Sequence, residues 1–197
     1  MTLNEFISKY DNENAIVLLE GKRLVAEHET KLLVQLGELL ATKTKNMMFR
    51  SGNADGSDYY FSLGVTSVDR TRLEVITPYD GHRKKTNLAY ETISLGGINL
   101  VADSEVVYQS KSNKKFSKLV DQYVDGKRDQ YSIKAAYIIR DTMKALGYNE
   151  IKPATFGIYY DDLSNPKQGG TGHTMNVCNQ NDIPIIDQSI WFDWLKE

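Results

Sequence analysis

Three glycines within four residues, Gly169-Gly170-Thr171-Gly172, constrain the fold of this chain more than any other segment. Glycine has no side chain, so the backbone at such a run can approach a ligand closely. Strand-like apolar residues lie before it at 155–160 and after it at 183–187, with a short helical pattern between. A glycine-rich turn between a strand and a helix is the phosphate-binding arrangement of open α/β sheets. The segment therefore favours an α/β fold, and a tight turn without a ligand is the alternative interpretation.

Strand-like and helix-like patterns alternate through the first half of the chain. Apolar runs typical of strands lie at 15–19, 46–50 and 73–78, and segments typical of helices lie at 24–42 and 57–66. The uninterrupted apolar run at 15–19 suits a strand that is covered on both faces. A β-α-β-α-β order implies a parallel sheet with right-handed crossovers.

The second half continues this pattern around one less readable stretch. Helical spacing occurs at 2–10, 103–125 and 129–146, strand-like residues at 155–160 and 183–187, and an apolar-aromatic segment at 190–195. Gly147 is placed as the C-cap of a helix, and residues 79–102 supply an extra strand or helix. We therefore predict a single Rossmann-like α/β domain over residues 1–197, with a mostly parallel central sheet of about five strands flanked by helices.

Composition restricts the function classes open to such a domain. The 197 residues carry a formal net charge of −2, so general binding of polyanions, and nucleic acid as a partner, is not expected. Cys178 is the single cysteine, so no internal disulfide can form and a cytoplasmic location is expected. The N-terminus lacks a signal-peptide pattern, and no apolar run approaches the roughly 20 residues that span a bilayer. The three histidines show no metal-ligand spacing, so we expect no metal and no cofactor.

Three loops fall at the carboxyl ends of predicted parallel strands. They are Gly21-Lys22-Arg23, Arg50 to Asp58, and Gln168 to Thr174. In an open α/β sheet this edge is where ligands bind. Helix N-termini at about 55–57 and 171–173 are expected to converge on one anion, because their unpaired N–H groups and positive dipole ends favour negative charge.

Side chains of these loops complete a predicted phosphate site. Arg23 and Arg50 are expected to be charge-assisted donors, and Thr171 and Thr174 to offer hydroxyl groups. The candidate ligand-binding residues are Gly21, Arg23, Arg50, Ser51, Gly52, Ser57, Gly169, Gly170, Thr171, Gly172, His173 and Thr174.

Several of these positions also have a purely structural interpretation. Strand-end arginines such as Arg50 also form salt bridges between elements, and Lys22-Arg23 also suits a solvated helix entry. His173 fits a hydrogen-bonding or stacking residue better than a metal ligand. Tyr159-Tyr160 ends a strand beside the predicted site and can either stack on a base or close the edge of the core.

Taken in order, the three loops resemble those of the superfamily that joins the DNA-processing protein A (Smf) proteins to the Lonely Guy phosphoribohydrolases, often called SLOG. The pair Arg140-Asp141 also looks like the segment before the fourth strand in small members of phage and bacterial origin. The resemblance spans residues 14–188. It implies a Rossmann-like domain that binds a nucleotide or nucleotide-derived ligand between the second and last loops.

The chain departs from the Lonely Guy pattern where that pattern carries chemistry. Those enzymes have PGGxGTxxE, and the glutamate serves in hydrolysis of the N-glycosidic bond of a nucleoside monophosphate. The aligned positions here are Gln168, His173 and Asn176 in place of proline, threonine and glutamate. An amide cannot act as a general acid or base near neutral pH.

We therefore expect a protein that binds its ligand as a sensor, carrier or sequestering protein rather than as an enzyme. The alternative is a nucleotide N-glycosidic or phosphoribosyl hydrolase in which Asp55 or Asp58 replaces the glutamate, although Asp58 also suits a helix cap. A second alternative is a DNA-binding accessory protein, and the net charge argues against it. A homodimer is an expectation from the resemblance.

Overall fold

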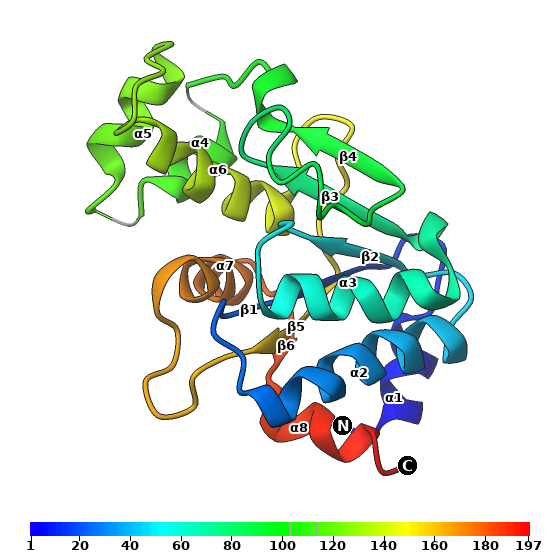
Figure 1. Cartoon of the computed structure of the whole chain (residues 1–197). Helices are drawn as coiled ribbons and strands as arrows, with labels where there is room; N and C mark the ends of the chain where they lie inside the picture. The colour runs from blue at the N-terminus through cyan, green and yellow to red at the C-terminus, as the bar shows by residue number, and fades with distance from the viewer. Residues whose placement is uncertain (103, 113) are drawn as a thin grey trace.

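The centre of the fold is a parallel sheet, seen in a computed structural model that describes residues 1–102, 104–112 and 114–197. Within these residues the sheet has six strands in the order β4-β3-β2-β1-β5-β6, and every neighbouring pair is parallel (Figure 1). The strands are β1 Ile16–Gly21, β2 Met48–Ser51, β3 Leu73–Thr77, β4 Glu91–Ser94, β5 Phe156–Tyr160 and β6 Ile185–Ile186. The predicted α/β class with a parallel sheet flanked by helices is confirmed.

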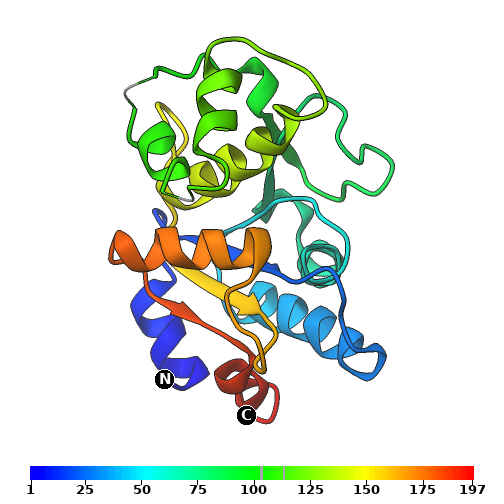
Figure 2. The ribbon, with the colours of Figure 1, turned by 90° about the vertical axis from the view of Figure 1, so that its left-hand side faces the viewer.

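Helices cover both faces of the sheet. They are α1 Leu3–Tyr10, α2 Thr30–Lys43, α3 Ser57–Val68, α4 Glu105–Ser110, α5 Ser117–Val124, α6 Ile133–Leu146, α7 Gly169–Gln180 and α8 Gln188–Trp194, with 3₁₀ turns at Glu27–Glu29, Arg70–Arg72 and Leu95–Gly97. The helices α1, α2, α3 and α8 lie on one face, and α6 and α7 lie on the other (Figures 1 and 2). Helices α4 and α5 pack against α6. None of the helices in the described ranges is long and apolar enough to cross a membrane.

The buried strands explain why both faces are covered. Along β1, Val17 and Leu19 join the core cluster formed with α2 and α3, while Leu18 points the other way into the cluster formed with α7. Successive side chains of a strand point to opposite faces. Five apolar residues in a row at 15–19 therefore require apolar cover on both sides, as the sequence predicts.

The order of the strands creates a switch point beside β1. The chain passes from β1 through α2 to β2 on one side, whereas β5 pairs with β1 on the other side. Connections that leave in opposite directions open a crevice at the carboxyl ends of these strands. The ends of β1 and β5 are therefore the place to look for a ligand site.

Several helix ends lie where capping residues in the sequence predict them. Thr2 and Glu5 form the capping box of α1, and Gly147 ends α6 with a φ of 68°. The helix expected over 57–66 is α3. These helix ends depend on hydrogen bonds between residues close in sequence and on backbone preferences, so they can be predicted from the local sequence.

Other helix predictions were wrong in their limits. The helix expected from Leu24 begins only at Thr30, because Ala26 is extended, with its amide donating to Tyr160 Oη at 3.4 Å, and a 3₁₀ turn at Glu27–Glu29 follows it. The charged helix expected over 103–125 is two separate helices, α4 and α5, and positions 103 and 113 lie outside the described residues. The stretch at 79–102 contributes the edge strand β4.

Candidate functional site

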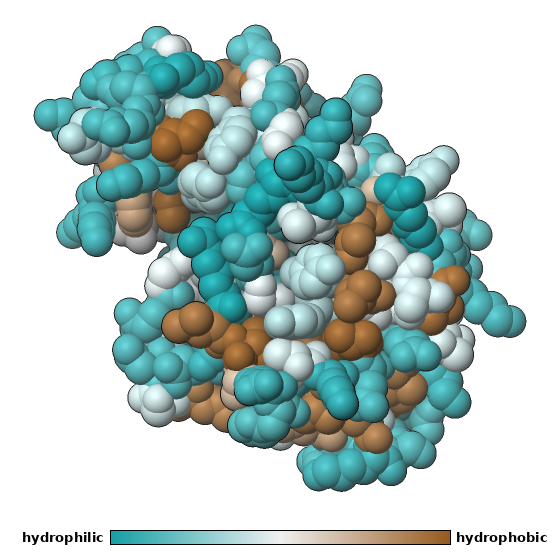
Figure 3. All heavy atoms as spheres, in the orientation of Figure 1, coloured by the Kyte–Doolittle hydropathy of each residue, from teal (hydrophilic) through white to brown (hydrophobic). Residues whose placement is uncertain are grey.

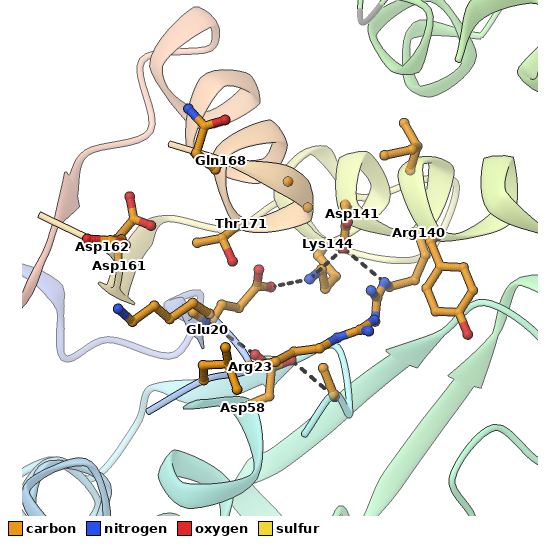
Figure 4. A pocket seen from close by; sticks show the side chains of 18 of the residues that line it. Glu20, Arg23, Asp58, Arg140, Asp141, Lys144, Asp161, Asp162, Gln168 and Thr171 are labelled. Carbon is orange, nitrogen blue, oxygen red and sulfur yellow. Dashed lines mark hydrogen bonds and ion pairs between the residues drawn. The ribbon is translucent and has the colours of Figure 1, made fainter. Parts of the chain in front are cut away.

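A cavity of about 650 Å³ lies at the carboxyl ends of β1 and β5 (Figure 4). Its walls come from the ends of these strands, the N-terminal ends of α3 and α7, and one face of α6. The polar lining residues are Glu20, Lys22, Arg23, Asp58, Lys134, Tyr137, Arg140, Asp141, Lys144, Asp161, Asp162, Asn165, Gln168 and Thr171. The cavity therefore occupies the switch point of the sheet, where open α/β folds bind their ligands.

The glycine segment forms the first turn of α7 rather than a loop before it. The helix begins at Gly169, two residues before the predicted start, and Gln168 is its N-cap. The N–H groups of Gly169, Gly170 and Thr171 have no hydrogen-bond partner among the residues that the structure describes. All three residues line the cavity. Unpaired amides at a helix N-terminus form an anion-binding end.

The conformation or the packing of the segment accounts for each glycine. Gly169 has a φ of +62°, a conformation that favours glycine. A Cβ on Gly170 would lie 2.8 Å from Asp141 Oδ2, and a Cβ on Gly172 would overlap the carbonyl oxygen of Lys167. The backbone thus accounts for Gly169 and Gly172 without a ligand, and the case for a ligand rests on the cavity and on the amides that lack a partner among the described residues.

Two predicted ligand residues of α7 do not reach the cavity. Thr174 is fully buried, and its hydroxyl donates to the carbonyl oxygen of Gly170 at 3.2 Å. His173 Nε2 lies 2.8 Å from Thr142 Oγ1, and burial lowers the pKa of the imidazole. His173 therefore has the hydrogen-bonding role of the structural alternative, and of the two predicted hydroxyls the one that lines the cavity belongs to Thr171.

Arg50 is not a donor to a ligand in this cavity, so that prediction was wrong. Its guanidinium is buried, with Nε 2.6 Å from Glu74 Oε1 and Nη1 2.8 Å from the carbonyl oxygens of Lys144 and Lys152. These contacts tie β2 to β3 and to both ends of the α6–β5 connection. The guanidinium is thus held beneath the α6–β5 connection, away from the carboxyl ends of the strands.

The second predicted loop is organised around Asp58. This buried carboxylate accepts hydrogen bonds from the amide of Gly21 at 3.3 Å, from the amide of Gly52 at 3.0 Å and from Ser51 Oγ at 3.2 Å. It also accepts from the amide of Ala54 at 3.3 Å. Asp58 therefore fixes the loop on the sheet edge.

The hydroxyls and the remaining acid of this loop are also committed elsewhere. Ser57 Oγ donates to the carbonyl oxygen of Lys22 at 2.7 Å, and Ser51 and Ser57 are fully buried outside the cavity lining. Gly52 packs under the Arg140 guanidinium, which donates to its carbonyl oxygen. Asp55 is exposed, pairs with Arg83, and does not line the cavity.

The first predicted loop remains at the site. Gly21, Lys22 and Arg23 all line the cavity. Within the described ranges the exposed guanidinium of Arg23 makes no hydrogen bond or ion pair. Figure 4 shows the side chains of Arg23 and Arg140 extending toward each other across the cavity. Both side chains line the cavity, and guanidinium groups are charge-assisted donors to an anion.

A buried charge cluster on the cavity floor was missed by the sequence prediction. Lys144 Nζ lies 2.6 Å from Glu20 Oε1 and 2.9 Å from Asp141 Oδ1, and Arg140 Nε lies 3.0 Å from the same Asp141 oxygen. All four residues are at most 5% exposed. Glu20 Oε1 pairs with Lys144 and Arg140 Nε pairs with Asp141, and neither of these two atoms meets hydrogen-bond geometry in the part of the chain that the structure describes.

The cluster shifts the pKa values of its two carboxyl groups in opposite directions. Burial raises the pKa of Glu20 to about 7, with Asp58 and Asp141 adding to the shift and Lys144 opposing it. Burial also acts to raise the pKa of Asp141, but Arg140 and Lys144 outweigh it and the net pKa is lowered. Environments that separate the pKa values of neighbouring acids are typical of functional sites.

The four charged residues of this cluster are visible in the sequence, but their local sequence context does not predict that they are buried together. Arg140, Asp141 and Lys144 lie in the middle and last turns of an amphipathic helix, where charged side chains ordinarily face water. Glu20 stands directly before the turn glycine. The resemblance had singled out Arg140-Asp141 without giving the pair a role.

The remaining candidate residues lie around rather than within the cavity. Tyr159 is buried with its hydroxyl 3.5 Å from Cys178 Sγ, and Tyr160 closes against Ala26, so the tyrosine pair belongs to the core edge. Asn176 is exposed on the outer face of α7. The position of the missing Lonely Guy glutamate therefore does not face this cavity. No group of three or more His, Cys, Asp or Glu among the described residues could hold a metal ion.

Comparison with known proteins yields one structural match. No family model and no curated protein matches the sequence. Among solved structures, DNA processing protein A from Helicobacter pylori, described for its single-stranded DNA binding mode, matches with 12% sequence identity and a TM-score of 0.47. The match covers 94% of this chain and 68% of that chain.

Proposed function

We propose that the protein binds a nucleotide or nucleotide-derived ligand in the cavity at the ends of β1 and β5. The observation that carries the proposal is the N-terminal end of α7, where three backbone amides without a hydrogen-bond partner among the described residues line the cavity. A phosphate at this end would accept their hydrogen bonds and interact favourably with the helix dipole.

Two further observations support an anionic ligand. Arg23 is exposed, lines the cavity and has no acidic partner in the described ranges. Arg140 also lines the cavity, although its Nε is already 3.0 Å from Asp141 Oδ1. Tyr137, Phe116 and Ile138 offer apolar surface to a base, and Asp162 offers acceptors to sugar hydroxyls.

A sensor, carrier or sequestering role fits this arrangement, in line with the resemblance to the SLOG superfamily. A cytoplasmic location and a homodimer are part of the same proposal and rest on that resemblance and on the composition. DNA binding has less support, because the net charge is −2.

The test is calorimetric titration of the protein with nucleoside monophosphates, for which AMP is the first probe. Thr171→Glu places a carboxylate at the N-terminal end of α7 and should weaken AMP binding at least tenfold, because it competes for the unpaired amides. Thr42→Glu, at an exposed threonine of α2, is the matched control and should leave the affinity unchanged. Equal affinities for wild type and Thr171→Glu would contradict the proposal.

Cleavage of the bound nucleotide is a second candidate function, and the Glu20 carboxyl group is the observation that favours it. A cavity-lining carboxyl with a pKa of about 7 is matched to general acid–base work near neutral pH. The acids first considered have less support, since Asp55 lies outside the cavity and Asp58 is occupied by loop amides. Release of free base from AMP that Glu20→Gln abolishes would establish cleavage, whereas binding without release supports the primary proposal.

A further inference from the structure

A second cavity of about 610 Å³ opens beside the first. Five residues line both cavities, and they are Phe116, Ile138, Gln168, Gly169 and Gly170. The space-filling view shows the surface indented between α7 and the helices α4 to α6, where these residues lie (Figure 3). The two cavities are therefore adjoining halves of one cleft.

The N-terminal end of α7 stands at the junction of the two halves. Gly169 and Gly170 belong to both linings, and their amides are among the three that lack partners in the described ranges. A phosphate held there would have open space on either side. A mononucleotide, whose phosphate is terminal, fills one side only.

The second cavity has the chemistry to hold a base. Asn176, Asn179 and Gln180 lie on the exposed face of α7, one helical turn apart, and line this cavity. Their side-chain amides make no hydrogen bond within the described residues. An amide group presents a donor and an acceptor together, which matches the edge of a nucleobase. Phe116, at the start of α5, adds apolar surface to the lining of this cavity.

The volumes agree with a two-part occupant. Each half lies within the roughly 300–1,000 Å³ typical of small-molecule sites, so each is large enough for one nucleoside. A ligand that is buried only in the first cavity would not contact the side-chain amides of Asn176, Asn179 and Gln180, which line the second cavity.

We propose that the ligand is a dinucleotide, in which two nucleosides flank a phosphate or pyrophosphate bound at the N-terminal end of α7. This inference rests on the proposed function and adds the ligand class to it. One nucleoside lies against Tyr137 in the first cavity, and the other lies against Asn176 and Gln180 in the second.

The experiment compares AMP with diadenosine pyrophosphate and with a single-stranded hexanucleotide by calorimetric titration at fixed salt. The wild-type protein should bind diadenosine pyrophosphate at least tenfold more tightly than AMP. The double variant Asn176→Ala/Gln180→Ala should lose about tenfold in affinity for the dinucleotide, because two hydrogen bonds are removed, and should keep its AMP affinity. Gln35→Ala, at an exposed glutamine of α2, is the matched control and should change neither.

The outcomes separate the two proposals. If neither AMP nor the dinucleotide binds, the proposed function itself fails. If AMP binds and the dinucleotide binds no more tightly, or if the double variant keeps full affinity for the dinucleotide, the dinucleotide inference is overturned while the proposed function stands. Tighter binding of the hexanucleotide than of the dinucleotide would assign the cleft to single-stranded nucleic acid and also overturn the inference.

Discussion

At the scale of single residues, the buried Glu20 carboxyl group links the cavity to the stability of the fold. Its pKa rises to about 7 from an ordinary value of 4.5, mainly through burial. Between these values the unfolded chain ionises the group while the folded protein keeps it protonated. The contribution of Glu20 to the free energy of unfolding is therefore fully present below about pH 4.5 and is lost as the pH rises through 7.

Glu20→Gln should remove this loss. We expect the free energy of unfolding of the variant, relative to wild type, to rise by roughly 2–3 kcal/mol between pH 4.5 and pH 8, since a shift of one pKa unit corresponds to about 1.4 kcal/mol. Urea denaturation at both pH values measures the difference. Glu38→Gln, at an exposed glutamate of α2, is the control. A Glu20→Gln difference that stays constant with pH would contradict the assigned protonation state.

At the scale of elements, the sequence predicts which segments are strands and helices better than where they begin. The strands at 15–19 and 155–160 and the helix ending at Gly147 follow from apolar runs and a cap, which are local. The start of α7 was placed two residues late, because glycine is a poor helix former and was assigned to a loop. Packing decides this end, since the Lys167 carbonyl oxygen leaves room only for glycine at position 172.

The same packing predicts a different cost for two glycines. Gly172→Ala should lower the free energy of unfolding by roughly 2–4 kcal/mol, because its Cβ would overlap the carbonyl oxygen of Lys167 and displace the first turn of α7. Gly97→Ala should change it by less than about 0.5 kcal/mol, since a Cβ there meets nothing within 4 Å. Urea denaturation of both variants tests the contrast, and equal effects would show that α7 tolerates a shifted first turn.

At the scale of the whole molecule, the sequence indicates the edge of the sheet that carries the cavity and the Arg23 of its lining, but not the buried charge cluster on its floor. The alternation of strands and loops places the carboxyl ends of parallel strands at one edge of the sheet, whereas the strand order that puts the cavity at the ends of β1 and β5 comes from the structure. In the charge cluster, Glu20 lies more than 100 positions in sequence from Asp141 and Lys144, and no local sequence pattern predicts such a contact. Arg50 shows the converse, since a strand-end arginine suits a ligand and a structural ion pair equally well in sequence.

Arg50 now supports a prediction about how the sheet positions the cavity. Its guanidinium holds Glu74 of β3 and the carbonyl oxygens of Lys144 and Lys152, so it anchors the end of α6 that carries the charge cluster. Arg50→Met should lower the free energy of unfolding by roughly 3–5 kcal/mol, because Glu74 is left as a largely buried charge without its partner.

The double variant Arg50→Met/Glu74→Leu separates the ion pair from the anchoring of α6. Removing both charges should recover roughly 1–3 kcal/mol of the unfolding free energy lost in Arg50→Met, measured by urea denaturation. The carbonyl oxygens of Lys144 and Lys152 remain without their donor in both variants. The double variant should therefore regain stability and still bind AMP more weakly than wild type, because Lys144 is less firmly held at the cavity floor. Full recovery of both properties would show that Arg50 serves only to neutralise Glu74.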